Sequence, residues 1–294
     1  MPNTPRYSST PGLFTRSLAV TAAVLGFSST ALAHFQVLYT PEMAPTKGKS
    51  TQFTMVFTHP VHGGPHMDMG QPEQFYVVSQ RGGDAKPKRT DLMKYVKPIN
   101  WLSNKKEKGG AAQNPTKAFD ASLPRSVTRS LGDHIFVLQP KPYYESGEDK
   151  YIQQFTRTIV NVGGVPGNWA EPMGLPAEIL PLNKPYANWV GGVFRGRVLA
   201  DGKPVPNAEM EIEFINHKPD QDGHRFAETG EVELPQDAYG TQTIYADAQG
   251  EFTIGLPRAG WWGICALAIG ADTEHEGKEL SQDAVLWVQA KDMK

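Results

Sequence analysis

The sequence has only one cysteine, Cys265, among its 294 residues. A single cysteine excludes an internal disulfide framework, an iron–sulfur cluster held by the chain's own thiolates, and a cysteine-rich zinc site. Positive charge is not in excess either, since 29 Lys and Arg residues stand against 31 Asp and Glu residues, so nucleic acid is not an expected partner. After residue 33 no segment has the 18 or so consecutive apolar residues that a membrane-spanning helix needs.

The sequence also lacks the short motifs that mark common enzyme classes. It contains no G-x-S-x-G elbow, no H-E-x-x-H pair and no glycine-rich phosphate loop. Glu145, Glu148 and Asp149 could pair for acid–base chemistry, but their polar surroundings favour charges on a loop. We therefore expect a binding protein and not an enzyme.

The first 33 residues have the features of an export signal. The only charged residues before His34 are two arginines, and an apolar run follows at residues 17–27. That run is too short to span a bilayer, and the Ala-Leu-Ala sequence at 31–33 provides the small residues that a signal peptidase requires. We expect cleavage after residue 33, a mature chain that begins at His34, and a location in the periplasm.

Short alternating runs predict that the mature chain is mainly β. The 29 glycines and 24 prolines favour many turns over long helices. Residues 52–59 place Phe53, Met55, Phe57 and His59 on one face, which predicts a half-buried strand. Similar short strands are expected at 74–79, 134–138 and 155–162.

Residues 84–130 differ from the rest of the chain in charge. They hold 11 Lys and Arg residues against 4 Asp and Glu residues, together with a Gly-Gly pair and scattered prolines. This composition predicts a solvated loop region, with a binding patch as the alternative.

A change of pattern near residue 185 predicts a second β-rich region. Segments rich in glycine and proline at 163–167 and 180–185 have the composition of a connector. A strand is expected at 194–199, a tight turn at Asp201-Gly202, an alternating strand at 209–215, and a turn followed by a strand at 246–254. This succession over residues 190–294 resembles the small carboxypeptidase regulatory-like, or transthyretin-like, sandwich, which implies a fold and no particular chemistry. We expect two β-sandwich-like domains, at 34–185 and 186–294. Residues 201–294 carry 18 acidic against 7 basic residues, which we interpret as a solvated acidic face.

Cleavage after residue 33 would give His34 two metal-binding groups. A free N-terminal histidine offers its α-amine and its imidazole as a bidentate chelate. The α-amine has a pKa of about 7.7–8.0, so a metal displaces its proton at neutral pH at little cost.

A second group of metal-binding residue types lies at 59–69. Three histidines, one aspartate and two methionines fall within these 11 residues, and a Gly-Gly-Pro segment allows the loop to fold inward. Imidazoles suit nickel, cobalt, copper and zinc. We predict one divalent-metal site, with Ni²⁺ or Co²⁺ as its cargo and Cu²⁺ as an alternative. Its predicted ligands are His34, His59, His62, His66 and Asp68.

The remaining histidines are weaker candidates for metal binding. His134 alternates with Phe136 and Leu138, which favours a structural role in a strand. His217, His224 and His275 lie in polar segments of the acidic region, where surface histidines are expected. A second, weaker metal contact through one of these three stays open.

Five segments of the mature chain carry a resemblance to a known family. They are 33–36, 57–60 with 67–70, 142–145, 189–198 with 204–208, and 257–263. Together they resemble the periplasmic component of bacterial nickel and cobalt uptake systems, a family long described as a domain of unknown function. The resemblance implies an extracytoplasmic β protein that binds Ni²⁺ or Co²⁺ and assists a membrane transporter of the energy-coupling type.

Two other interpretations remain open at this point. A free N-terminal histidine on a β-sandwich is also typical of histidine-brace copper proteins, either periplasmic copper carriers or oxidative polysaccharide enzymes. His59 could be the second histidine of such a brace. Because Cu²⁺ binds nitrogen donors more tightly than Ni²⁺ or Co²⁺ does, the donor types alone do not identify the metal. The second β-rich region alone would also fit a non-metal adhesion or carbohydrate module.

Overall fold

The computed structural model describes residues 34–80, 86–102 and 115–293, and the expected export signal at 1–33 lies outside this part. The described residues belong to one unit, which spans residues 32–294. The protein is mainly β, as expected. Its described helical elements are short, and none is long and apolar enough to cross a membrane. They are η1 (Met93–Tyr95), α1 (Arg125–Thr128) and η2 (Asp237–Tyr239).

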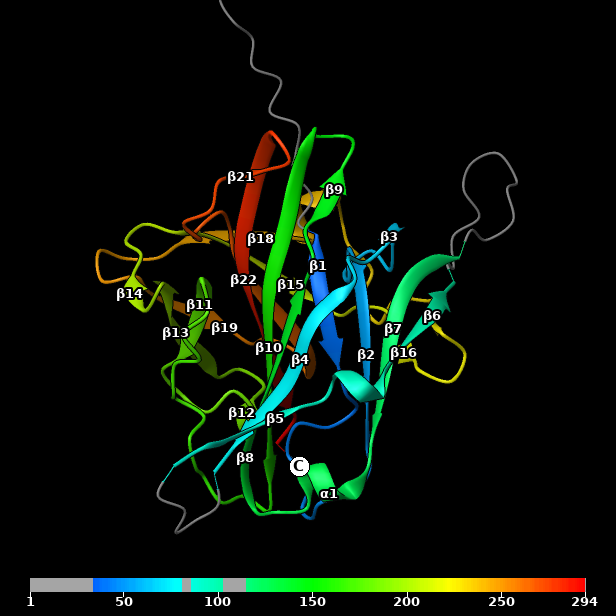
Figure 1. Ribbon diagram of the computed structural model, residues 1–294, viewed down its shortest axis with the longest axis vertical. Helices are drawn as coiled ribbons and strands as arrows, with labels where there is room; N and C mark the ends of the chain where they lie inside the picture. Colours follow the sequence, from blue (N-terminus) through cyan, green and yellow to red (C-terminus); the bar gives the residue numbers. More distant parts are fainter. Residues whose placement is uncertain (1–33, 81–85, 103–114, 294) are drawn as a thin grey trace, which may run out of the picture. The chain divides into compact units, whose positions relative to one another are not determined.

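The first sheet has five antiparallel strands (Figure 1). Their order is β1-β2-β7-β6, and the short β3 pairs with β2. Their bounds are β1 (Phe35–Tyr39), β2 (Thr51–Thr58), β3 (His66–Met67), β6 (Val96–Trp101) and β7 (Thr116–Leu123). The register places Phe35 opposite Thr58, so the beginning of β1 lies beside the end of β2.

The second sheet has eleven strands, in the order β18-β15-β20-β22-β10-β8-β4-β5, with β12 and β21 on β22 and β9 on β10. The bounds are β4 (Pro72–Ser79), β5 (Lys88–Asp91), β8 (Gly132–Pro140), β9 (Tyr143–Glu145), β10 (Lys150–Val162), β12 (Asn188–Trp189), β15 (Glu209–Phe214), β18 (Gln242–Tyr245), β20 (Gly260–Ala266), β21 (Glu274–His275) and β22 (Lys278–Lys291). The long strands β10 and β22 run parallel, with Tyr151 opposite Leu280. The expected domain boundary at residue 185 therefore lies between strands that share one sheet.

Two smaller sheets account for the other described strands. One has the order β11-β13-β14, with β19 on β13, and the other pairs β16 with β17. Their bounds are β11 (Ala177–Pro181), β13 (Val193–Ala200), β14 (Lys203–Pro204), β16 (Pro219–Asp220), β17 (Arg225–Phe226) and β19 (Glu251–Gly255).

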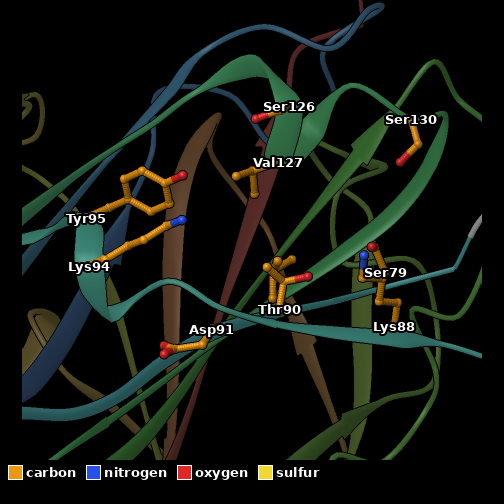
Figure 2. Close-up of a pocket in the computed structure, with 10 residues that line it drawn as sticks. Ser79, Lys88, Thr90, Asp91, Lys94, Tyr95, Ser126, Val127 and Ser130 are labelled. Atoms are coloured by element: carbon orange, nitrogen blue, oxygen red, sulfur yellow. The ribbon is translucent and has the colours of Figure 1, made fainter.

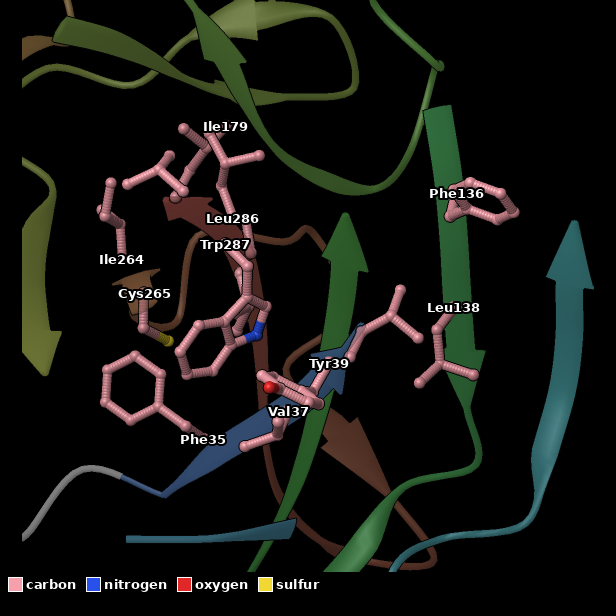
Figure 3. Close-up of a cluster of buried hydrophobic side chains, with 14 of the residues drawn as sticks. Phe35, Val37, Tyr39, Phe136, Leu138, Ile179, Ile264, Cys265, Leu286 and Trp287 are labelled. Carbon is pink, nitrogen blue, oxygen red and sulfur yellow. The ribbon is translucent and has the colours of Figure 1, made fainter. Parts of the chain in front are cut away.

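Strand β1 packs its aromatic side chains against the second sheet. The ring centroids of Phe35 and Trp287 are 5.9 Å apart in an edge-to-face arrangement. The indole N–H of Trp287 donates to the carbonyl of Gln36 at 3.0 Å. Figure 3 shows Phe35 and Tyr39 among the buried side chains, next to Trp287 and Cys265. Cys265 is free and buried. This packing fixes β1 and, with it, the backbone at His34.

Strand β2 is buried on both faces, and not on one face as its alternation predicted. Phe53 and Met55 belong to the hydrophobic core, but Thr54 and Thr58 on the opposite face are also buried. The Thr54 hydroxyl donates to Oδ1 of Asp120 at 2.8 Å, and the Thr58 hydroxyl shares a hydrogen bond of 2.7 Å with Nδ1 of His66. A hydroxyl group that keeps a hydrogen bond can be buried at little cost. The threonines on this face were therefore no evidence that the face is exposed to solvent.

The basic segment at 84–130 is not the solvated loop that its composition predicted. Its described part forms β5, η1, β6, β7 and α1. Phe119, Ala121 and Leu123 alternate along β7 and are buried. The charge balance of the whole segment obscured this short alternation.

Candidate functional site

His34 and His59 lie side by side at the ends of two paired strands. His34 directly precedes β1 and His59 directly follows β2, and the antiparallel register brings these two ends together. The ring centroids are 4.5 Å apart, with 51° between the ring planes. His59 is 3% exposed, whereas the His34 side chain retains 14% exposure. Both residues were predicted ligands, and the sheet brings them into contact.

Glu145 is a third side chain at this position, where sequence analysis expected a loop charge. It ends β9, which pairs with the beginning of β10 so that Glu145 lies opposite Lys150. Oε2 of Glu145 is 3.1 Å from Nε2 of His34, and both side chains are largely shielded from solvent. The carboxylate accepts the Nε2–H of a neutral His34, which leaves Nδ1 as the ring nitrogen with a free lone pair.

Burial and charge act in opposite directions on His34. Burial lowers the pKa of His34 below its usual 6.5 and outweighs the attraction of Glu145 and Glu148, which raises it. The imidazole is therefore neutral at neutral pH, as metal binding requires. Burial and the Glu145 carboxylate raise the pKa of Tyr143 to about 12, so this phenol keeps its proton.

A buried amide on β10 holds the backbone at the beginning of β1. Nε2 of Gln154 donates to the carbonyl of His34 at 2.6 Å, and its Oε1 accepts the N–H of Gln36 at 2.6 Å. The same amide donates to Oδ2 of Asp283 at 3.2 Å. Gln154 thus fixes the chain on both sides of Phe35, and His34 is positioned by the second sheet as well as by β2.

The loop after His59 is held by a buried carboxyl group on β15. Oε2 of Glu213 accepts the N–H of Val61 at 3.2 Å, and its Oε1 accepts the Thr241 hydroxyl at 2.6 Å. Asn216 adds a donor to the carbonyl of Val61 at 3.1 Å. Burial raises the pKa of Glu213 to about 8. The acidic residues of this region were expected on a solvated face, but Glu213 is 0% exposed.

Two of the other predicted ligands are engaged by different partners. Nδ1 of His66 shares its hydrogen bond with Thr58, and Oδ1 of Asp68 accepts the N–H of Lys117 at 2.7 Å. His62 lies in the loop after β2, where its Nε2 packs close to Gly240. Within the described ranges, no group of three or more His, Cys, Asp or Glu side chains is arranged to hold a metal ion.

The remaining histidines each have a neighbour of their own. His134 is fully buried, and its Nε2 lies 3.0 Å from the carbonyl of Ser130, which fits the structural role expected for it. The neighbours of His217, His224 and His275 are the carbonyl of Ala227, Oδ2 of Asp120 and the ring of Tyr151, respectively.

The sequence matches a family whose function is unknown. Residues 31–270 match the family described as "Domain of unknown function (DUF4198)". The chain therefore belongs to the DUF4198 family. A comparison with curated proteins finds no match.

Several solved structures show a remote likeness to the chain. The D0-D1 domain of intimin is 12% identical with a TM-score of 0.21, over 87% of this chain and 100% of that one. The adhesin InvE of Yersinia pseudotuberculosis is 13% identical with a TM-score of 0.22, over 85% of this chain and 58% of that one. The α2-macroglobulin of E. coli is 8% identical with a TM-score of 0.21, over 88% of this chain and 14% of that one. Scores this low carry no argument about fold or function.

Proposed function

We propose that the protein is an extracytoplasmic binding protein for a divalent transition metal, nickel or cobalt, and that it assists uptake by a membrane transporter. The observation that carries this proposal is the contact between the His34 and His59 rings, whose centroids are 4.5 Å apart. The resemblance to nickel and cobalt uptake components supports the transport role, because its segments 33–36 and 57–60 contain both histidines.

The proposed site uses three nitrogen donors from two residues. Cleavage after residue 33 would free the α-amine of His34, which closes a chelate ring together with Nδ1 of the same residue. His59 would supply the third nitrogen. Glu145 suits this arrangement, because a carboxylate that accepts a hydrogen bond from the other ring nitrogen orients a metal-binding histidine and strengthens it as a donor.

The donor set favours a cargo that is bound and released. A structural zinc site would have four ligands, usually including cysteine thiolates, whereas the chain's one cysteine is buried in the core. Three nitrogen donors leave coordination positions open for water or for a ligand of the transporter. The partial exposure of His34 gives the metal a route in and out.

A His59→Ala change tests the site directly. The measurement is calorimetric titration of the mature protein with Ni²⁺. We expect the affinity to fall at least tenfold, which is about 1.4 kcal/mol of binding free energy. His275→Ala is the matched control, because His275 lies on β21 against Tyr151 and is no predicted ligand of this site. Unchanged affinity in His59→Ala would place the nickel site elsewhere.

A periplasmic copper carrier is the second candidate, because the same three nitrogens suit Cu²⁺. Tighter copper binding in vitro does not separate the two, since Cu²⁺ binds such donors more tightly in any case. Deletion of the gene does separate them. Lower cellular nickel or cobalt under limitation, with copper tolerance unchanged, supports the first candidate. Altered copper tolerance with unchanged nickel would replace it by the copper carrier.

A further inference from the structure

A polar pocket of about 440 Å³ lies apart from the proposed metal site (Figure 2). It is lined by residues of β4, β5, η1 and α1, together with Ser130. Glu145, beside His34, pairs with Lys150 at the beginning of β10, whereas Gly132, two residues after Ser130, pairs with Val162 at its end. The 13 residues of β10 span roughly 40 Å, so the pocket and the metal site are separate.

Two lysines give the pocket a positive charge. Figure 2 shows Lys94 on one side of the pocket and Lys88 on the other, with Thr90 between them. Among the residues that the structure describes, no carboxylate pairs with either ammonium. The one carboxylate in the lining, Asp91, has its Oδ1 engaged by the N–H of Met93 at 2.9 Å. The ammonium of Lys94 lies 5.0 Å from the ring centroid of Tyr95. With two lysines against one aspartate, the lining carries a net positive charge.

Hydroxyl groups from three segments of the chain line the same pocket. No hydroxyl of this set has a hydrogen-bond partner within the described part of the protein. Val77 and Val127 supply a small apolar wall. The hydroxyl-bearing residues are Ser79, Thr90, Tyr95, Ser126 and Ser130.

We propose that this pocket binds a small organic anion that itself carries hydroxyl groups, such as a sugar acid. The ammonium groups of Lys88 and Lys94 would bind its carboxylate through charge-assisted hydrogen bonds. The serine, threonine and tyrosine hydroxyls can each donate and accept, which matches the hydroxyls of such a ligand. The volume lies within the range of small-molecule sites, and the lining is too polar for a hydrophobic ligand. The proposal does not depend on the metal site.

Calorimetric titration of the metal-free protein with gluconate tests the proposal. Glucose has the hydroxyls without the charge, and acetate has the charge without the hydroxyls. We expect gluconate to bind at least tenfold more tightly than either. Absence of gluconate binding at millimolar concentration, or equal binding of acetate, would overturn the proposal.

A pair of double variants locates the binding. The double variant Lys88→Met/Lys94→Met should weaken gluconate binding at least tenfold. Both lysines are exposed, so the variant should fold, and its circular dichroism spectrum should match that of the wild type. Lys97→Met with Lys203→Met removes the same charge from exposed positions outside the pocket lining and should leave binding unchanged. Equal loss in both double variants would show a general charge effect and contradict a built site.

Discussion

Glu145 illustrates how one residue can decide which nitrogen of a histidine is available. Its carboxylate lies 3.1 Å from Nε2 of His34, so the lone pair of the neutral ring is at Nδ1. In the proposed site Nδ1 is the nitrogen that chelates together with the α-amine. Glu145 therefore acts through His34 and positions it.

A Glu145→Ala change, which removes the acceptor for Nε2–H of His34, tests this positioning role. We expect Ni²⁺ affinity to fall about 10–100-fold, as is usual when the hydrogen-bond partner of a metal-binding histidine is altered. Nitrogen NMR shifts of His34 in the metal-free protein should show a larger share of the tautomer with its proton on Nδ1. Glu148→Ala removes a neighbouring charge that does not bond to His34 and serves as the control. An unchanged tautomer would contradict the role.

Glu178 shows the cost of burying charge. Its carboxylate accepts from the fully buried guanidinium of Arg157 at 2.5 Å and from the N–H groups of Met173 and Gly174. Burial also lowers the pKa of Arg157, because the charged form loses its hydration. Removal of one partner from such a pair leaves the other charge buried and uncompensated.

A Glu178→Ala change should therefore lower the free energy of unfolding by about 3–5 kcal/mol. Denaturant titration followed by circular dichroism measures the effect. Glu42→Ala is the control, because Glu42 pairs with Lys49 and Lys291 near the surface, where such pairs contribute about 1 kcal/mol or less. Equal losses in the two variants would contradict this account of the buried pair.

At the scale of elements, β15 and the loop after β2 are joined through Glu213. Its carboxyl keeps its proton up to a pH of about 8 in the folded protein, whereas an exposed glutamate loses it near 4.5. Between these two pH values the folded state binds more protons than the unfolded state. The contribution of Glu213 to stability therefore falls as pH rises through this window, by about 1.4 kcal/mol per pH unit.

Glu213→Gln should flatten that fall, because glutamine keeps an acceptor for Val61 but does not titrate. The free energy of unfolding of metal-free protein, measured from pH 5 to pH 8, should decline less steeply in the variant. Glu233→Gln, at an exposed position away from this strand, should keep the wild-type slope. Parallel pH profiles for wild type and Glu213→Gln would contradict the buried titration.

Alternating patterns in the sequence predicted the positions of strands more reliably than they predicted which side chains are buried. The runs at 52–59 and 209–215 are β2 and β15, because apolar side chains at every second position suit a pleated strand. Burial of Thr54 and Glu213 on the opposite faces could not be predicted. A polar side chain is buried only where a distant partner meets it, as Asp120 and Val61 do here.

Of the three side chains at the candidate site, two were predicted from the sequence. His34 and His59 were found from residue type and from their positions beside a cleavage site and a strand end. Glu145 was missed, because it reaches His34 only through the β9–β10 hairpin. The Tyr-Tyr pair before it is typical of a strand and could have indicated β9. In the structure the rings of Tyr143 and Phe57 pack with their centroids 5.1 Å apart.

At the scale of the whole molecule, the parallel pairing of β10 and β22 links segments far apart in the sequence. The pairing runs from Tyr151 opposite Leu280 to Thr158 opposite Trp287. Each strand lies between two neighbours in the second sheet, so a fragment with only one of them would expose unpaired backbone groups and apolar side chains.

Fragments 34–185 and 186–294 should therefore not unfold cooperatively when each is produced alone. Thermal unfolding followed by tryptophan fluorescence and circular dichroism would show broad transitions for each fragment, and mixing them should restore a sharp one. A fragment that unfolds by itself at the temperature of the intact chain would contradict this dependence.

In the proposed site the α-amine of His34, its imidazole and His59 bind the metal together. This shared binding is tested by the Ni²⁺ affinity of two proteins, one that begins at His34 and one that retains Ala33, each verified by intact mass. The added residue turns the His34 amine into an amide and leaves both imidazoles in place. We predict at least tenfold weaker binding, about 1.4 kcal/mol, when Ala33 is retained. Equal affinity of the two proteins would contradict it.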